Sequence, residues 1–158
     1  MDKELSTIVL VLITGLLIFA VAQPIIPNLN QPFSEIGILG PQKTISNYPK
    51  QLVMGQNFSI YVYVGNHEKV TEYYQVLLKL GNRSTITNGS SYTNLPVIST
   101  YSYVLNDNQN VTFPVTMSIN QTGLNQGLLF ELWIYNTSSS SFGYSGDRGL
   151  LWVNVTKV

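Results

Sequence analysis

One group of neighbouring residues in the sequence could carry out acid–base chemistry, Asn66-His67-Glu68. Histidine titrates close to neutral pH, and an adjacent carboxylate such as Glu68 can orient its imidazole. A general base also needs a nucleophile within hydrogen-bonding reach, but the sequence has no Gly-x-Ser-x-Gly elbow or comparable motif. The group follows Gly65 at the end of a predicted strand, where we expect a turn whose side chains hydrogen-bond nearby backbone. We therefore favour a structural role for the group over a catalytic one.

Cofactor chemistry finds little support elsewhere in the sequence. The chain has no cysteine and one histidine, which excludes disulfides, thiolate zinc sites and multi-histidine metal sites. The carboxylates are scattered, without the spacing of a calcium-binding loop. Residues 143–149 contain three glycines but no Lys-Ser/Thr, which indicates a flexible hairpin loop rather than a phosphate-binding loop. We predict no catalytic residue, no cofactor and no metal, and hence no enzymatic activity.

Charge and composition narrow the function further. Eight Lys and Arg residues balance eight Asp and Glu residues, whereas nucleic-acid binding depends on clustered positive charge. Charged residues make up only 10% of the chain, against roughly 25% in an average soluble domain. Asn, Ser, Thr, Tyr and Gln must therefore hydrate the surface. A length of 158 residues suits one domain together with a membrane anchor.

The elements that position these residues are predicted to be β-strands. Residues 58–64 alternate strictly between apolar and polar faces, and residues 73–80 repeat the pattern. Segments rich in Gly, Asn, Ser and Pro separate the strands, and no stretch after residue 32 has a convincing helical period. This organisation predicts a mainly β fold, an antiparallel immunoglobulin-like β-sandwich of about seven strands. The expected strands cover residues 33–39, 58–64, 73–80, 97–104, 111–118, 128–135 and 150–155.

The alternation also predicts which residues fill the core and which face outwards. Trp133 and Trp152 are expected on the faces of their strands opposite the core. Glu131 lies in a strand rich in Leu and Phe, and it either faces outwards or pairs with Arg148 or Lys79. The expected core residues are Phe58, Ile60, Val62, Val76, Leu78, Phe130, Leu132, Ile134 and Val153. Four tyrosines could form an aromatic stripe that stacks on sugars, although a simple pleated surface is the more common meaning of such a pattern: Tyr61, Tyr63, Tyr101 and Tyr103.

The N-terminus has the length and apolar character of a membrane anchor. Residues 5–26 carry no charge, and about 20 apolar residues at 1.5 Å each cross a hydrocarbon core of roughly 30 Å. We predict a single transmembrane helix with a short head over residues 1–26, which contacts lipid through residues 5–26. The proline-rich residues 27–32 are predicted to be an extended stalk, followed by the sandwich domain over residues 33–158. The protein would then be a single-pass protein of the cell membrane.

Two other interpretations of the N-terminus remain open. Ala20-Val21-Ala22 has the small-x-small form that signal peptidase prefers, which predicts cleavage before Gln23. Leu5-Ser-Thr-Ile8, after a charged tetrapeptide, resembles the N-terminus of archaeal type IV pilins. The residue before that cut would be Glu4 instead of the usual Gly or Ala, which argues against processing. A retained anchor is the simplest of the three interpretations.

Seven Asn-x-Ser/Thr triplets occur in the polar part of the chain. About three are expected by chance from 15 asparagines and 28 serines plus threonines. The excess favours exposure to a glycosylation pathway, and it therefore places the C-terminal domain outside the cytoplasm with N-glycans attached covalently. The predicted glycosylation sites are Asn57, Asn82, Asn88, Asn110, Asn120, Asn136 and Asn154.

Several short motifs of the chain resemble a known family. Residues 33–41, 48–49, 53–55, 62–68 and 74–76 resemble, in this order, the C-terminal extracytoplasmic domain of DUF1616, an archaeal membrane-protein family of unknown function. The resemblance continues through residues 128–135, 148 and 151–155, and it covers about 120 residues. Family members usually carry several transmembrane helices before this domain, so no activity of those helices is implied for this chain. The matching motif residues, expected to be structural, are Tyr48, Pro49, Asn66, His67, Glu68, Arg148 and Trp152.

The sequence thus predicts a non-enzymatic, membrane-anchored, extracytoplasmic β-sandwich. Its expected role is that of an accessory or interaction subunit in a larger membrane or cell-envelope complex, with other protein subunits as partners and no nucleic acid. The alternative is a pilin-like or stator-like subunit of an archaeal surface filament, because such proteins also join one hydrophobic helix to a β-sandwich.

Overall fold

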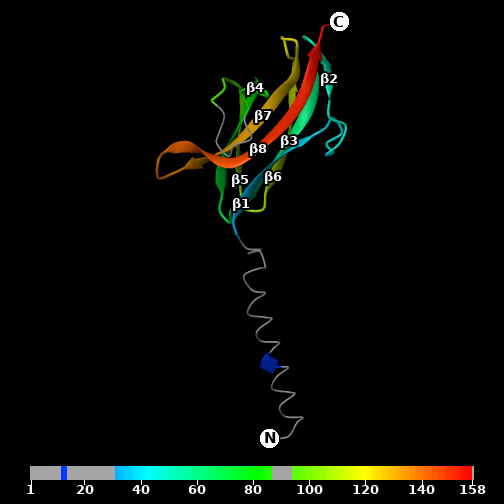
Figure 1. Ribbon diagram of the computed structural model, residues 1–158. Coiled ribbons are helices and arrows are strands. Elements are labelled where there is room, and N and C mark those ends of the chain that lie inside the picture. Colours follow the sequence, from blue (N-terminus) through cyan, green and yellow to red (C-terminus); the bar gives the residue numbers. More distant parts are fainter. Residues whose placement is uncertain (1–11, 14–30, 87–93, 158) are drawn as a thin grey trace. The chain divides into compact units, whose positions relative to one another are not determined.

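The computed structural model describes residues 12–13, 31–86 and 94–157. The chain divides into two units, Met1–Gln31 and Pro32–Val158, and the described part of the second forms the strands labelled in Figure 1. These are β1 (Phe33–Leu39), β2 (Gln51–Val53), β3 (Phe58–His67), β4 (Glu72–Asn82), β5 (Val97–Leu105), β6 (Asn110–Met117), β7 (Gly123–Asn136) and β8 (Ser141–Thr156).

The strands form two sheets that pack as a sandwich. The smaller sheet has the order β1-β3-β6, and the larger has the order β2-β8-β7-β4-β5. All pairs are antiparallel except β2 with β8, where Gln51 lies beside Asn154 in parallel register. The predicted mainly β, antiparallel architecture is therefore confirmed, while β2 and its parallel pairing were missed. Three residues are too few to show a period in the sequence, and only the neighbouring β8 makes β2 a strand.

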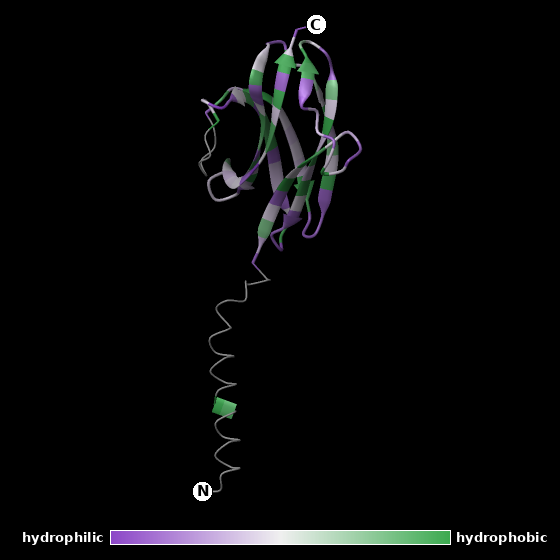
Figure 2. Cartoon of the chain, turned by 45° about the vertical axis from the view of Figure 1, so that its right-hand side comes forward, coloured by the Kyte–Doolittle hydropathy of each residue, from purple (hydrophilic) through white to green (hydrophobic). Residues whose placement is uncertain are grey.

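Alternation along the strands builds the core between the sheets, and Figure 2 shows hydrophobic and hydrophilic residues alternating along them. Seven of the nine predicted core residues are buried, whereas Phe58 and Ile134 are partly buried and pack against the core. The largest fully buried apolar side chains are Tyr74 and Phe130, from the neighbouring strands β4 and β7. With no cysteine in the chain, this apolar packing supplies the contact between the sheets that a disulfide gives other sandwiches.

Two segments predicted as loops belong to strands instead. β3 continues through Asn66 to His67, because β1 pairs with this end on one side and β6 reaches Gly65 on the other. Residues 143–149 lie within β8, where they pair with the equally long β7. A Cβ at Gly149 would lie 2.8 Å from the side chain of Ile38, so this glycine allows β1 to approach β8. Pairing partners from distant segments thus overrode the local turn signals.

The predicted tyrosine stripe does not form. Tyr61 and Tyr63 lie on the outer face of the smaller sheet, because they alternate with the buried residues of β3. Tyr101 and Tyr103 belong to the larger sheet and pack inwards against Phe113, with ring centroids 4.9 Å away in both cases. The two halves of the stripe therefore lie on different sheets and different faces.

The predicted anchor (residues 1–26) and most of the predicted stalk (residues 27–32) lie outside the described residues, apart from the helical residues 12–13. Within the part that the structure describes, no helix has the length and hydropathy needed to cross a membrane. The anchor therefore remains a prediction.

One ion pair is buried on the larger sheet. The Lys79 ammonium on β4 lies 2.8 Å from the Glu131 carboxylate on β7, and Glu131 is 0% exposed. The indole N–H of Trp133 donates to the same carboxylate over 3.2 Å, and Arg148 lies opposite Glu131 in the register of β7 and β8. Lys79, one of the two partners predicted for Glu131, forms an ion pair with it. Because a buried charge is costly without a partner, each member of the pair depends on the other.

We expect Lys79→Met to lower the free energy of unfolding by about 3 kcal/mol, which is the low end for breaking a buried pair, because Trp133 and Arg148 remain near the carboxylate. The double variant Lys79→Met/Glu131→Gln should recover part of this loss, since it removes the buried carboxylate charge and keeps an acceptor for Trp133, although Arg148 then loses a neighbouring carboxylate. Urea unfolding of the detergent-purified chain, followed by tryptophan fluorescence, measures both. A single variant as stable as the double variant would contradict the prediction.

Candidate functional site

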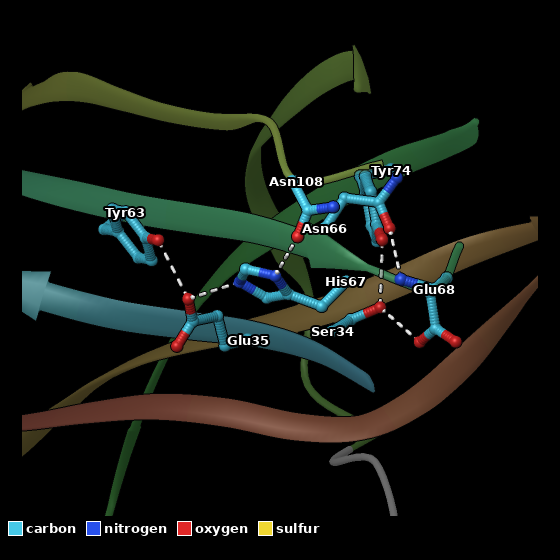
Figure 3. Close-up of polar contacts among 8 residues, drawn as sticks. All are labelled: Ser34, Glu35, Tyr63, Asn66, His67, Glu68, Tyr74 and Asn108. Atoms are coloured by element: carbon cyan, nitrogen blue, oxygen red, sulfur yellow. Dashed lines mark hydrogen bonds and ion pairs between the residues drawn. The ribbon is translucent and has the colours of Figure 1, made fainter. Parts of the chain in front are cut away.

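Eight polar side chains form a group linked by hydrogen bonds (Figure 3). It collects residues from the start of β1, the last part of β3, the turn after it, the start of β4 and the turn between β5 and β6. We name it the polar end cluster, and its members are Ser34, Glu35, Tyr63, Asn66, His67, Glu68, Tyr74 and Asn108. It contains the Asn-His-Glu motif that the sequence singled out, and it is therefore the candidate site.

Asn66 ties three segments of backbone together. Its side chain is 0% exposed, and its amide nitrogen donates to the carbonyls of Val70 and Leu105, both over 2.8 Å. Its amide oxygen accepts the backbone N–H of Glu68 over 2.9 Å. The three bonds fix the turn between β3 and β4 and attach it to the end of β5. Asn66 is therefore a buried structural residue within a strand, not the turn residue that the sequence predicted.

The His67 imidazole lies between two oxygen acceptors, as Figure 3 shows. Nε2 lies 3.2 Å from the Glu35 carboxylate, and Nδ1 lies 3.2 Å from the amide oxygen of Asn108. The Asn108 amide nitrogen donates to Asp107 over 2.7 Å, and this bond directs the amide oxygen towards the ring. Both ring nitrogens can therefore act as donors only in the protonated imidazolium. The hydrogen bonds to Asn108 and Glu35 accordingly raise the pKa of His67 above its ordinary value.

Glu35 and the Phe33 ring complete the surroundings of the imidazole. The Tyr63 hydroxyl donates to the same Glu35 oxygen over 2.8 Å. Phe33 stacks on His67 with ring centroids 4.6 Å apart, and a ring face attracts a cation. Burial and the Glu35 carboxylate raise the pKa of Tyr63, so its hydroxyl stays protonated and keeps donating.

A second chain of hydrogen bonds runs from the core to Glu68. Ser34 donates its one hydroxyl hydrogen to the Glu68 carboxylate over 2.7 Å. The Tyr74 hydroxyl, 2.9 Å from the Ser34 oxygen, must therefore be the donor in that contact. Burial raises the pKa of Tyr74 to about 12, so this donor remains protonated at physiological pH. Glu68 thus holds a serine on β1, whereas the sequence suggested that it orients His67.

This geometry stabilises the end of the domain. Among the described residues, the hydrogen-bond partners of the His67 ring are Glu35 and Asn108, and neither is a nucleophile. Ser34 is the hydroxyl residue beside the motif, and its hydrogen is directed to Glu68. No group of three or more His, Asp and Glu side chains in the described segments could hold a metal ion.

The other motif residues lie outside the polar end cluster. The Tyr48 hydroxyl donates to the Ile38 carbonyl over 2.8 Å and so attaches the segment before β2 to β1. Pro49 lies two residues before β2, and Arg148 and Trp152 lie on β8. The structure therefore divides the motif residues between one cluster and several separate packing positions.

Five members of the polar end cluster were not identified as site residues from the sequence. They come from four segments that only the strand pairing brings together. The pairing of β1 with β3, for example, places the start of β1 beside His67, with Phe33 opposite it. A faint signal was available in the run Asn106-Asp107-Asn108, which the sequence marks as a turn. The five members are Ser34, Glu35, Tyr63, Tyr74 and Asn108.

The predicted glycosylation sites differ in exposure. Asn154 is half-buried in β8, and its side-chain oxygen accepts the backbone N–H of Asn125 over 2.8 Å. Asn88 lies outside the described residues. The remaining five sites are exposed: Asn57, Asn82, Asn110, Asn120 and Asn136.

We expect Asn66→Ala to cost about 2 kcal/mol of unfolding free energy, because it leaves the buried Leu105 carbonyl without this partner at a cost of about 1–3 kcal/mol, and it also removes two partly buried bonds. His67→Ala is the matched control from the same motif. It should cost much less, since that side chain is partly exposed and removes no backbone partner. Urea unfolding compares the two variants. Equal losses would contradict the assignment of Asn66 as the structural residue.

The pKa of His67 should lie above 6.5, the ordinary value, and it should fall in Asn108→Ala and Glu35→Gln. A histidine whose pKa is higher in the folded state adds stability below the unfolded pKa, and this contribution is lost as the pH rises through the folded pKa. Because His67 is the single histidine of the chain, an NMR titration follows one imidazole signal. A pKa at or below the ordinary value would contradict the hydrogen-bond assignment.

Comparison with solved structures places the fold near a known domain. The crystal structure of the CARDB domain of the PF1109 protein from Pyrococcus furiosus, solved in complex with di-metal ions, is similar with a TM-score of 0.51 and 11% identity. The match covers 80% of this chain and 90% of that domain. The solution structure of the same domain gives a TM-score of 0.51 at 11% identity, covering 79% and 95%. At this identity the likeness shows the fold alone.

A weaker likeness involves a β-glucosidase from Listeria innocua, with a TM-score of 0.48 and 14% identity. It covers 80% of this chain but only 16% of the enzyme, so it concerns one small part of a much larger protein. No curated protein matches the sequence.

A family model matches residues 27–154, which includes nearly all of the sandwich. The match confirms the resemblance seen in the short motifs. Because it spans most of the sequence, the chain belongs to the DUF1616 family, described as a domain of unknown function.

Proposed function

We propose that this protein is a non-enzymatic, membrane-anchored subunit whose sandwich lies outside the cytoplasm and binds another component of a membrane or cell-envelope complex. One observation carries the proposal: the side chains best suited to chemistry bond to each other or to the backbone. Both nitrogens of His67 face acceptors, and Ser34 donates to Glu68. A catalytic base usually lies within hydrogen-bonding reach of a nucleophile, whereas the His67 ring contacts a carboxylate and an amide.

The proposed location rests on the N-terminal apolar segment and on the sequons of the domain. The uncharged residues 5–26 are long enough for an anchor, and five of the seven sequons are exposed on the domain. A surface wetted by Asn, Ser and Thr instead of charges is also suited to glycans. Within this proposal, Asn154 stays unmodified because it is half-buried in β8, unlike the five exposed sequon asparagines.

A second candidate function is a filament subunit. The observation that favours it is Leu5-Ser-Thr-Ile8, which resembles the start of a processed pilin, followed by an apolar segment and a β-sandwich. The two candidates differ in the mature N-terminus, since a filament subunit would begin at Leu5.

The test is purification from native membranes in mild detergent, with N-terminal sequencing, intact mass and identification of co-purifying proteins. We expect a chain that begins at Met1 or Asp2, exceeds 17.6 kDa by glycan increments, carries none at Asn154 and is bound to other subunits. A start at Leu5 would support the filament subunit. A start at Gln23 would remove the anchor. A chain that purifies with no other protein would contradict the proposed role.

A further inference from the structure

The two sheets have four edges, and three of them are protected against further strand pairing. β2 has only three residues. β6 carries Pro114, which cannot donate to a neighbouring strand. β1 carries Glu35, lies against β8 and has the carbonyl of Ile38 occupied by Tyr48. Short length, proline, charge and coverage are the devices by which proteins prevent edge-to-edge association.

The fourth edge, β5, has none of these protections before its last residue, Leu105, whose carbonyl accepts a bond from Asn66. Its nine residues, Val97–Leu105, contain no charge, no proline and no glycine. Among the described strands, only β4 pairs with it. Ile98 is 49% exposed and Val104 is 64% exposed, so apolar side chains lie at the surface of an open edge. The pairing with β4 shifts between Leu78 and Lys79, which leaves Ser99–Leu105 as the regular part of the strand. Such an edge is a template for another strand.

The outward-facing residues of β5 are nearly symmetric about Tyr101. An antiparallel pair of two copies keeps the outer face outward only if paired positions have the same parity, so the two-fold axis passes through one residue. With the axis at Tyr101, that residue opposes itself. In that register Thr100 lies opposite Ser102, and Ile98 lies opposite Val104. Polar residues face polar ones at the centre, and apolar residues face apolar ones towards the ends. A shift by two residues would oppose Thr100 to Val104 and lose this match.

The absence of charge is also significant for a self-pair. Across a two-fold axis, a charged residue near the centre lies close to its own copy, and like charges directly opposite destabilise a pair. β5 has no such residue. None of the strands β4, β6, β7 and β8 combines the length of β5 with an open edge and an absence of charge. We propose that β5 is a self-association surface, on which two copies of this chain pair antiparallel about Tyr101. The larger sheets of the two copies then form one continuous sheet.

This inference does not depend on the identity of any partner complex, and it can fail or succeed separately from the proposed function. The first test uses charge at the centre of the pair in the full-length chain in detergent, with mass measured by analytical ultracentrifugation. Thr100→Lys/Ser102→Lys places lysines opposite lysines, and we expect it to be monomeric where the unchanged chain is a dimer. Thr100→Lys/Ser102→Glu is the matched control. It places opposite charges across the axis and should remain dimeric.

A monomeric unchanged chain would overturn the proposal. A dimer that survives Thr100→Lys/Ser102→Lys would also overturn it, because another surface, such as the N-terminal segment, would then hold the copies together. Loss of the dimer in both double variants would contradict the register. Both positions are exposed, and the tryptophan fluorescence of each variant confirms that it folds.

The second test reads the register directly, since the chain has no cysteine of its own. Thr100→Cys and Ser102→Cys are made as separate chains with tags of different mass, mixed and oxidised. Opposite positions lie within disulfide range, whereas diagonal positions lie about 7–8 Å apart, too far for a disulfide. We expect the disulfide only between the two different chains. A disulfide within Ser102→Cys alone or Thr100→Cys alone would indicate a shifted register, and none in any mixture would overturn the pairing.

Discussion

The structure depends on one apolar contact between its two sheets. The strands β4 and β7, in the middle of the larger sheet, pack with their apolar side chains against the smaller sheet. Tyr74, Val76 and Leu78 alternate on β4, and Phe130 and Leu132 lie beside them on β7. No disulfide joins the sheets, so burial of these side chains supplies the main driving force for closing the sandwich. β8 is positioned by β7 and β5 by β4, so every other strand of the larger sheet depends on this pair.

Tyr74 connects this core with the polar end cluster. Its ring is fully buried, while its hydroxyl donates to Ser34 and, through it, supports Glu68. A tyrosine can serve both environments because its body is apolar and its end is polar. A buried polar group also needs a partner on the outer side of the larger sheet, where Lys79 pairs with the buried Glu131 carboxylate. Buried polar groups in this domain are accepted only where a specific partner reaches them.

The polar end cluster shows why a motif that looks catalytic can be structural. Asn66 has the three bonds of a backbone clamp, and His67 is held between Glu35 and Asn108. The hydrogen bonds described for these side chains are made to other protein atoms. The open features of the domain are of another kind, namely an uncharged strand edge on β5 and exposed asparagines of sequons. Both are suited to contact with macromolecules, and they agree with a role in assembly.

The sequence by itself determined the β class, the faces of the strands and most of the core. Alternation at residues 58–64 and, less strictly, at residues 73–80 indicates which side chains face the core, because successive residues of a strand point to opposite faces. The family was also readable from short motifs such as Tyr48-Pro49 and Asn66-His67-Glu68. These features are local, and local patterns survive in a single sequence.

Tertiary structure decided where the strands end and which side chains meet. Gly65 and residues 143–149 have turn signals, yet pairing with β1, β6 and β7 makes them strands. β2 exists only because β8 lies beside it. The contacts of His67 with Glu35 and Asn108 join residues more than 30 positions apart. Such contacts depend on the register between distant strands, and register results from the packing of the whole core rather than from any one segment.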